Sequence, residues 1–147
     1  MADLWFSELE SKLFTRIKYE LTTKPEAPFP QLNCTTVSNS DTPTKFPTLY
    51  FHELEPVERG ADLEGKTVNA VMETIEMQVY SNQSEKECKE IISEAIGIMK
   101  DLSFGITMFP NPQTRNKISF AIARCRRMIA HGDYDITNRK PQQQTGE

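Results

Sequence analysis

The chain lacks the sequence patterns that would place it in a membrane or outside the cell. No apolar run approaches the roughly 20 residues that a membrane-spanning helix needs. Residues 1–8 contain no basic start followed by an apolar block and a small-residue cleavage site, so we predict no secretion signal. We therefore expect a protein that is made and kept in the cytoplasm of its host, without membrane contact.

Cysteine is scarce. The three cysteines, Cys34, Cys88 and Cys125, are odd in number, and none of their spacings is that of a metal or redox site. Since a disulfide framework needs paired cysteines, we predict three reduced thiols in the core.

Motifs that carry chemistry are also missing. The chain has no Gly-x-Ser-x-Gly, no glycine loop of the phosphate-binding kind and no His-Glu-x-x-His. His131 with Asp133 and Asp135 faintly resembles a metal site, but such oxygen-rich spacing is common by chance. Glu73 and Glu76 are three residues apart in a predicted strand, so they face opposite sides and cannot act as a carboxylate pair. We predict no enzymatic activity, no cofactor and no bound metal.

The composition is that of a globular protein. Of the 147 residues, 37% are hydrophobic and 26% are charged, which suits a single domain with one core. The last residues are rich in Gln, Thr, Asn and Lys. We therefore predict one domain over residues 1–135 and a flexible C-terminal tail over residues 136–147.

Charge is unevenly distributed along the chain. Residues 103–147 contain seven Lys or Arg and three acids, a net charge of +4, so the total of −4 leaves −8 for residues 1–102. An acidic protein is a poor candidate for wrapping duplex DNA. Opposite charge in the two parts instead allows head-to-tail contact between identical subunits.

Two amphipathic helices are indicated. Residues 3–21 carry an apolar stripe at spacings of three and four, and Asp3 can cap the start. The second helix follows Ser84, which forms a capping box with Glu87, and it extends to Leu102. The first stripe is Phe6, Leu9, Leu13, Ile17 and Leu21; the second is Cys88, Ile91, Ile92, Ala95, Met99 and Leu102.

Five segments are predicted as strands, and short connections favour antiparallel pairing. The expected fold is α+β, with an antiparallel sheet of about four to five strands, two helices packed on one of its faces, and the order α-β-β-β-α-β-β. An acidic loop is expected within the connection 55–67, and Gly105 should end the second helix. The predicted strands are residues 32–37, 48–54, 68–80, 106–109 and 117–130.

The last predicted strand points to a protein partner. Ile118, Phe120 and Ile122 share one face, while small residues from Ser119 to Cys125 share the other and leave room for a helix. If the helices cover only one face, the large apolar side chains need another cover, which favours self-association. Local curling of the sheet, burying both faces, is the alternative.

Three arginines follow directly, at positions 124, 126 and 127. They form either a solvated strand end or a docking surface for acids of a neighbouring subunit. A contact with DNA phosphate is the weaker possibility, because no stacking aromatic alternates with the arginines. The candidate interface residues are Glu55, Glu58, Asp62, Glu64, Ile118, Phe120, Ile122, Arg124, Arg126 and Arg127.

Several segments together resemble a known family. The family's first helix is similar to Leu-Phe-Thr-Arg-Ile-Lys-Tyr-Glu-Leu (13–21). Its segment with Phe-Pro entering a strand is similar to Lys-Phe-Pro-Thr-Leu-Tyr-Phe-His-Glu-Leu (45–54), and its central strand is similar to Glu-Met-Gln-Val-Tyr-Ser-Asn (76–82). Met108-Phe109 before Pro-Asn-Pro, with Ala-Arg-Cys-Arg (123–126), is similar to its closing hairpin. From Met1 to about Asp135, the pattern resembles minor capsid or tail-completion proteins, found in the neck of tailed phages and prophages of Gram-positive bacteria.

The resemblance implies a structural role without catalytic residues. Such proteins are similar in fold to tail terminators, which form a ring, commonly of six subunits, at the head-proximal end of the tail tube. The expected partners are further copies of the chain, the tail tube protein and a head-completion neck protein. DNA would pass through the ring without specific binding, since an acidic lumen repels its backbone. The expected location is the virion, after assembly in the bacterial cytoplasm.

Three alternatives remain open. The chain could be a head-completion or stopper protein bound to the portal. It could be a monomeric protein-binding module of a mobile element. It could also be a hydrolase or nuclease with an unfamiliar site, in which case His131 and Asp133 would be needed for a metal-dependent activity.

Overall fold

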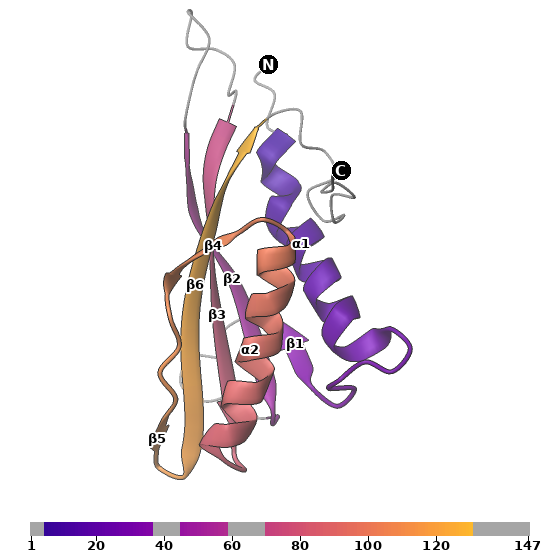
Figure 1. Ribbon diagram of the computed structural model, residues 1–147, viewed down its shortest axis with the longest axis vertical. Helices are drawn as coiled ribbons and strands as arrows, with labels where there is room; N and C mark the ends of the chain where they lie inside the picture. Colours follow the sequence, from indigo (N-terminus) through magenta and orange to yellow (C-terminus); the bar gives the residue numbers. More distant parts are fainter. Residues whose placement is uncertain (1–4, 37–44, 59–69, 131–147) are drawn as a thin grey trace, which may run out of the picture.

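The computed structural model describes residues 5–36, 45–58 and 70–130. In this part of the chain, a mixed six-stranded sheet carries helices α1 (Leu9–Lys18) and α2 (Glu85–Asp101) on one face (Figure 1). The predicted α+β class is therefore confirmed. The strands are β1 (Asn33–Thr35), β2 (Thr48–Glu58), β3 (Ala70–Ser81), β4 (Gly105–Met108), β5 (Gln113–Arg115) and β6 (Ile118–Ala130).

The sheet differs from the prediction in direction and in strand number. The strand order is β1-β2-β3-β6-β4, with β5 also paired to β6. The predicted antiparallel sheet is wrong because β1 pairs in parallel with β2, where Asn33 aligns with Thr48. The predicted count and order are wrong because β5 adds a strand. Both β1 and β5 span only three residues, too few for an alternating pattern to show.

The first helix is tighter at its start and wider at its end than an α-helix. A 3-10 turn over Trp5–Glu8 leads into α1, and a π turn over Tyr19–Thr23 follows it. The Lys24 N–H donates to the Tyr19 carbonyl at 2.9 Å, and Lys24 itself is extended because Pro25 follows. The expected stripe is buried from Leu9 to Leu21 and Phe6 is partly buried, whereas the expected cap Asp3 lies outside the described residues.

The second helix begins as predicted and ends differently. The Ser84 hydroxyl accepts a hydrogen bond from the Glu87 N–H at 3.1 Å, but the Glu87 carboxylate turns to the Ser81 hydroxyl, so only half of the capping box forms. At the other end, Ser103 takes a φ of 73° and the Phe104 N–H reaches the Met99 carbonyl at 3.0 Å. The predicted helix stop, Gly105, is instead the first residue of β4.

The acidic connection is partly strand. Since β2 extends to Glu58, Glu55 and Glu58 belong to the sheet and not to a loop, which corrects the prediction. The β2–β3 register shifts between Leu54 and Val57, where the chain contains Pro56. Predicted interface residues Asp62 and Glu64 lie outside the described residues.

The final hairpin turns at Asn116 and Lys117. Asn116 and Lys117 have φ values of 55° and 67°, as in the two-residue turns that join tightly paired strands. Lys117 is therefore a turn residue, and the last strand begins at Ile118. The strand before this turn, β5, directly follows Pro112.

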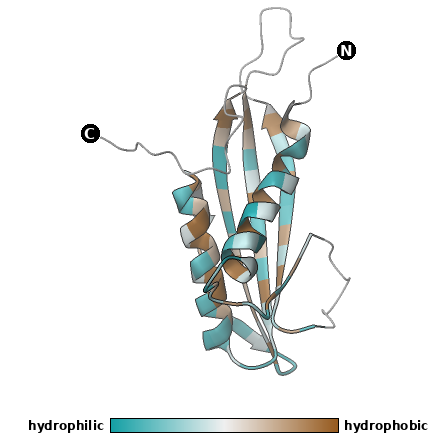
Figure 2. Ribbon diagram, turned by 90° about the vertical axis from the view of Figure 1, so that its right-hand side faces the viewer, coloured by the Kyte–Doolittle hydropathy of each residue, from teal (hydrophilic) through white to brown (hydrophobic). Residues whose placement is uncertain are grey.

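The core lies between the sheet and the helices. Ala121, Ala123 and Cys125 are fully buried, as predicted for the small face of the last strand. In Figure 2 the two helices lie over one face of the sheet, each with hydrophobic and hydrophilic stretches along its length. The longest pairing, between β3 and β6, runs without a register shift from Ala70–Ala130 to Ser81–Ser119 and forms the centre of the sheet.

Candidate subunit interface

The sheet has an outer face, the side away from α1 and α2, and no described helix covers it (Figure 1). Side chains alternate along β6, so every second residue points outward. The outward residues on β6 are Ile118, Phe120, Ile122, Arg124, Arg126 and Met128, and those facing them on β3 include Tyr80, Gln78, Glu76, Thr74 and Met72.

The predicted apolar trio is half-buried and not open. Ile118, Phe120 and Ile122 point outward as expected, but each has intermediate exposure. The Tyr80 ring stacks on Phe120 with centroids 6.3 Å apart, and the Arg115 guanidinium lies 5.6 Å from the Phe120 centroid. Local cover, the alternative to a partner, therefore accounts for part of this surface.

The centre of the outer face is a hydrogen-bonded ladder. The Tyr80 hydroxyl donates to Gln78 Oε1 at 2.7 Å, and Gln78 Nε2 donates to Glu76 Oε1 at 2.8 Å. Arg124 Nε donates to the other oxygen, Glu76 Oε2, at 2.8 Å. Burial raises the pKa of Tyr80, and Glu76 adds to the shift. The polar groups of this ladder are satisfied within one chain, so it needs no partner.

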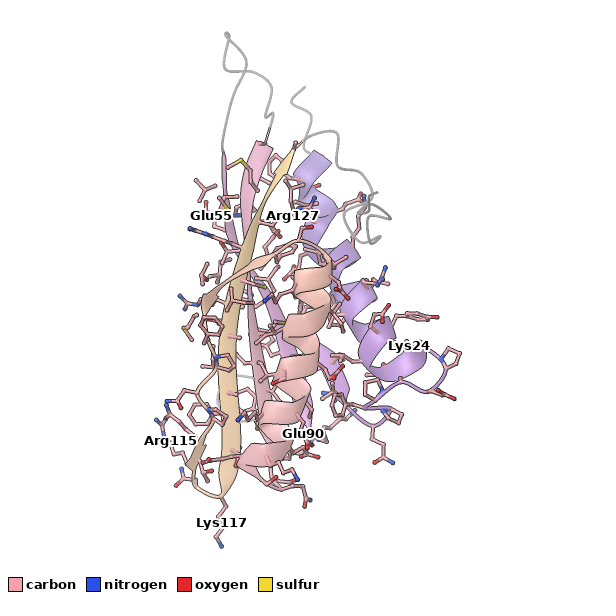
Figure 3. All side chains as sticks on the ribbon, in the orientation of Figure 1. Lys24, Glu55, Glu90, Arg115, Lys117 and Arg127 are labelled. Carbon is pink, nitrogen blue, oxygen red and sulfur yellow. The ribbon has the colours of Figure 1, made fainter. Side chains whose placement is uncertain are left out.

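The three predicted arginines have three different environments. Arg124 pairs with Glu76, and Arg127 points to the helix side, where its Nη1 donates to the Leu102 carbonyl at 3.0 Å. Arg126 is exposed and forms no ion pair or side-chain hydrogen bond with the described residues. Figure 3 marks Arg127 beside the end of the sheet near α1. Of the three arginines predicted to form one docking surface, only Arg126 is therefore both on the outer face and without a partner among the described residues.

Exposed apolar side chains gather near Arg126. Val57 on β2, Met72 on β3 and Met128 on β6 are aligned by the register in one row across the outer face, with Val57 46% and Met128 51% exposed. On the margin strand β4, Gly105 lies opposite Arg126, and an added Cβ there would meet open space. Farther along β4, Met108 lies opposite Arg124 and is 38% exposed, and Phe109, the residue after the strand, is 76% exposed.

We call Arg126, Met108, Phe109 and Met128 the Arg126 patch. Methionine, arginine and aromatic residues are the types enriched at the centre of protein interfaces. Sequence reasoning had missed Met128, although continued alternation from Phe120 would have placed it on this face. The sequence had singled out Phe109 only as part of the Met108-Phe109 motif in the family resemblance.

The acids expected to meet these arginines are only partly described. Glu55 is exposed on β2 and makes no ion pair with the described residues. Figure 3 marks Glu55 at the β2 side of the sheet. Glu58 ends β2, but its side chain lies outside the description.

A buried carboxyl cluster lies on the opposite, helix-covered face. Glu73 is fully buried, and neither of its carboxyl oxygens has a hydrogen-bond partner among the described residues. Burial raises the pKa of Glu73 far above its usual range, and the neighbouring Glu53 and Glu10 raise it further. Glu73 therefore keeps its proton at neutral pH.

This cluster was not predicted. The opposite orientation of Glu73 and Glu76 is confirmed, since Glu76 belongs to the outer ladder. The missed partners are Glu10 and Glu53, which are 43 residues apart in the chain and meet only through the fold.

The margin of β2 is protected against strand addition. β1 pairs only with Thr48–Tyr50, and beyond it the Glu53 N–H donates to Glu10 Oε2 at 2.9 Å. Pro56 offers no N–H, and the bulge around it twists the edge. These features are the ones by which natural proteins block edge-to-edge pairing.

No catalytic arrangement emerges from the described residues. Among them, no three His, Cys, Asp or Glu side chains converge as ligands for a metal ion, and no helix of this part is long and apolar enough to cross a membrane. The pattern of His131, Asp133 and Asp135 lies outside the described residues. The three cysteines are free, with Cys88 and Cys125 buried and Cys34 half-buried.

In comparisons with known proteins, no family model matches the chain, and no curated protein matches it either.

Proposed function

We propose that this protein is a structural protein of a phage virion, a tail terminator that forms a ring at the head-proximal end of the tail tube and joins tail to head. The observation that carries the proposal is the Arg126 patch, where an exposed arginine without an ion-pair partner among the described residues shares its face of the sheet with exposed Met128. Such a combination favours a role in assembly with another protein chain.

The energetics of the patch support association. Burying a large side chain such as Phe109 or Met128 stabilises a contact by about 1–2 kcal/mol each when it is as exposed as these are. Arginine and aromatic residues are also the types that most often dominate binding energy when a partner excludes water from them. A few such anchors are enough for a specific contact.

The particular role in the tail rests on the family resemblance of residues 1–135. Under this proposal the partners are further copies, the tail tube protein and a head-completion protein, and no catalytic step is involved. The chain's net charge of −4 fits a channel through which DNA passes without adhering.

Electron microscopy with assembled tail tubes tests the proposal. The full chain is added to tubes made from the tail tube protein of the same phage, and we expect rings at one end only, with tubes that then join filled heads. Binding to the portal of filled, tailless heads would favour the stopper alternative. A strict monomer that binds neither tubes nor heads and is absent from virions would overturn the structural role.

A further inference from the structure

We propose that neighbouring copies meet head to tail, with Glu55 on the β2 margin of one copy paired to Arg126 beside the β4 margin of the next. The inference rests on the proposed ring, and it names the residues that join its subunits. The occupant of the Arg126 patch is thus a second copy of this chain.

The charges at the two sides of the sheet are complementary. Glu55 lies on β2, and its described surroundings offer it no cation. Arg126 lies on β6 with only the glycine end of β4 beyond it, and its described surroundings offer it no acid. Attraction between these two groups favours a contact between the β2 margin of one copy and the β4 side of another.

Glu55 and Arg126 of one chain do not satisfy each other. β3 lies between their strands, and two strand spacings amount to about 10 Å, well beyond an ion pair. Within the described residues neither has a partner, so both are available to another copy. In a head-to-tail contact, Glu55 of each copy pairs with Arg126 of the next, and such heterologous contacts form a closed ring when the rotation between copies is suitable.

The contact is made by side chains and not by a continuous sheet. On the β2 margin, Pro56, the bulge and the bond from Glu53 to Glu10 prevent strand addition, as described above. Val57, next to Pro56 on the same strand, is exposed and can pack against Met108, Phe109 and Met128 of the neighbour. An apolar contact flanked by one charge pair is the usual composition of an interface centre and its rim.

Disulfide trapping in the full chain tests this geometry. In the double variant Glu55→Cys with Arg126→Cys, the two sulfurs of one chain are too far apart to bond, so any new disulfide joins two copies. Under mild oxidation we expect a ladder of covalent dimers, trimers and larger species on a non-reducing gel. Each single variant should give no ladder, because both positions are needed for every link.

The matched control replaces the arginine at the other end of the outer face, Arg115→Cys with Glu55→Cys, and should give no ladder. A product that stops at the dimer would overturn the head-to-tail contact, since a two-fold contact links only two chains. No cross-link at all would overturn it too. Neither result affects the proposed function if the unmodified chain forms rings on tail tubes. Absence of such rings with the unmodified chain would overturn the proposed function itself.

Discussion

Glu10 on α1 and Glu53 on β2 are joined by a hydrogen bond in which the Glu53 N–H donates to Glu10 Oε2 at 2.9 Å. Buried Glu73 on β3 lies near both, and its pKa is raised by burial first and then by Glu53 and Glu10. Three acids from the first helix and two strands are therefore grouped together, and the grouping is least costly while Glu73 keeps its proton.

The stability of the fold should consequently fall as pH rises. The unfolded chain releases the Glu73 proton above about pH 4.5, the ordinary pKa of this group, whereas the folded protein retains it. A raised folded-state pKa thus contributes stability that is present below the unfolded pKa and is lost as pH climbs toward the folded one. Glu73→Gln keeps the size and polarity of the side chain without a titrating proton. It should raise the free energy of unfolding at pH 8 by about 1 kcal/mol or more.

Urea denaturation from pH 5 to pH 9 measures this difference. The control is Glu90→Gln on the exposed side of α2, which removes one carboxyl from the surface and should leave the slope unchanged. Equal pH slopes for the Glu73→Gln variant and the unmodified chain would contradict a retained proton.

The two outward arginines should separate stability from assembly. Arg124→Ala removes the partner of nearly buried Glu76 and should lower the free energy of unfolding by about 1–2 kcal/mol. Arg126→Ala removes a side chain without a described partner and should change stability by less than about 0.5 kcal/mol. Only Arg126→Ala should weaken ring formation. Denaturation measures the stability of both variants, and electron microscopy of tail tubes measures their ring formation. The reverse pattern would assign the interface to Arg124.

The sequence predicted the elements that carry a long periodic pattern. Both helical stripes and the alternation in β3 and β6 repeat often enough to identify the element and its buried face. It failed where pairing depends on few residues, as in the parallel contact of Asn33 with Thr48. Nothing in a three-residue segment encodes direction, because that depends on the path of the chain before it.

The turn between β5 and β6 offers a direct gain in stability. Lys117 has a φ of 67°, a conformation that costs an L-residue about 1 kcal/mol and glycine almost nothing. Lys117→Gly creates the Asn-Gly pair that favours this turn. Its thermal midpoint should rise in a melting experiment, while Lys86→Gly, inside α2, should lower it. A lower midpoint for Lys117→Gly would mean that the Lys117 side chain contributes more than its backbone costs.

The cysteines should be unreactive in the folded protein. Burial raises the pKa of Cys34 and Cys88 to about 11 and that of Cys125 to about 12, so few thiolates exist at pH 8. A thiol reagent such as Ellman's should label the native chain slowly and all three cysteines quickly after denaturation. Rapid labelling of one native thiol would point to Cys34, the half-buried one.

The candidate site was predictable in kind but not in detail. Period-two alternation already implies that Arg126 and Arg127 face opposite sides of a strand, so the helix-side position of Arg127 was within reach of the sequence. The pairing of Arg124 with Glu76 was not, because the two residues are 48 positions apart and only the register brings them together. The exposure of Phe109 likewise depends on where β4 ends.

The unbroken pairing of β3 with β6 gives the molecule a direction of mechanical strength. Hydrogen bonds between antiparallel strands run across the strand axes, so tension along the axes is shared by all twelve aligned residue pairs at once. Tension across the axes would instead open the pairs one after another from an end. Under the proposed role, a subunit mounted with these two strands along the line of pull between head and tail would therefore resist rupture far better than one mounted crosswise.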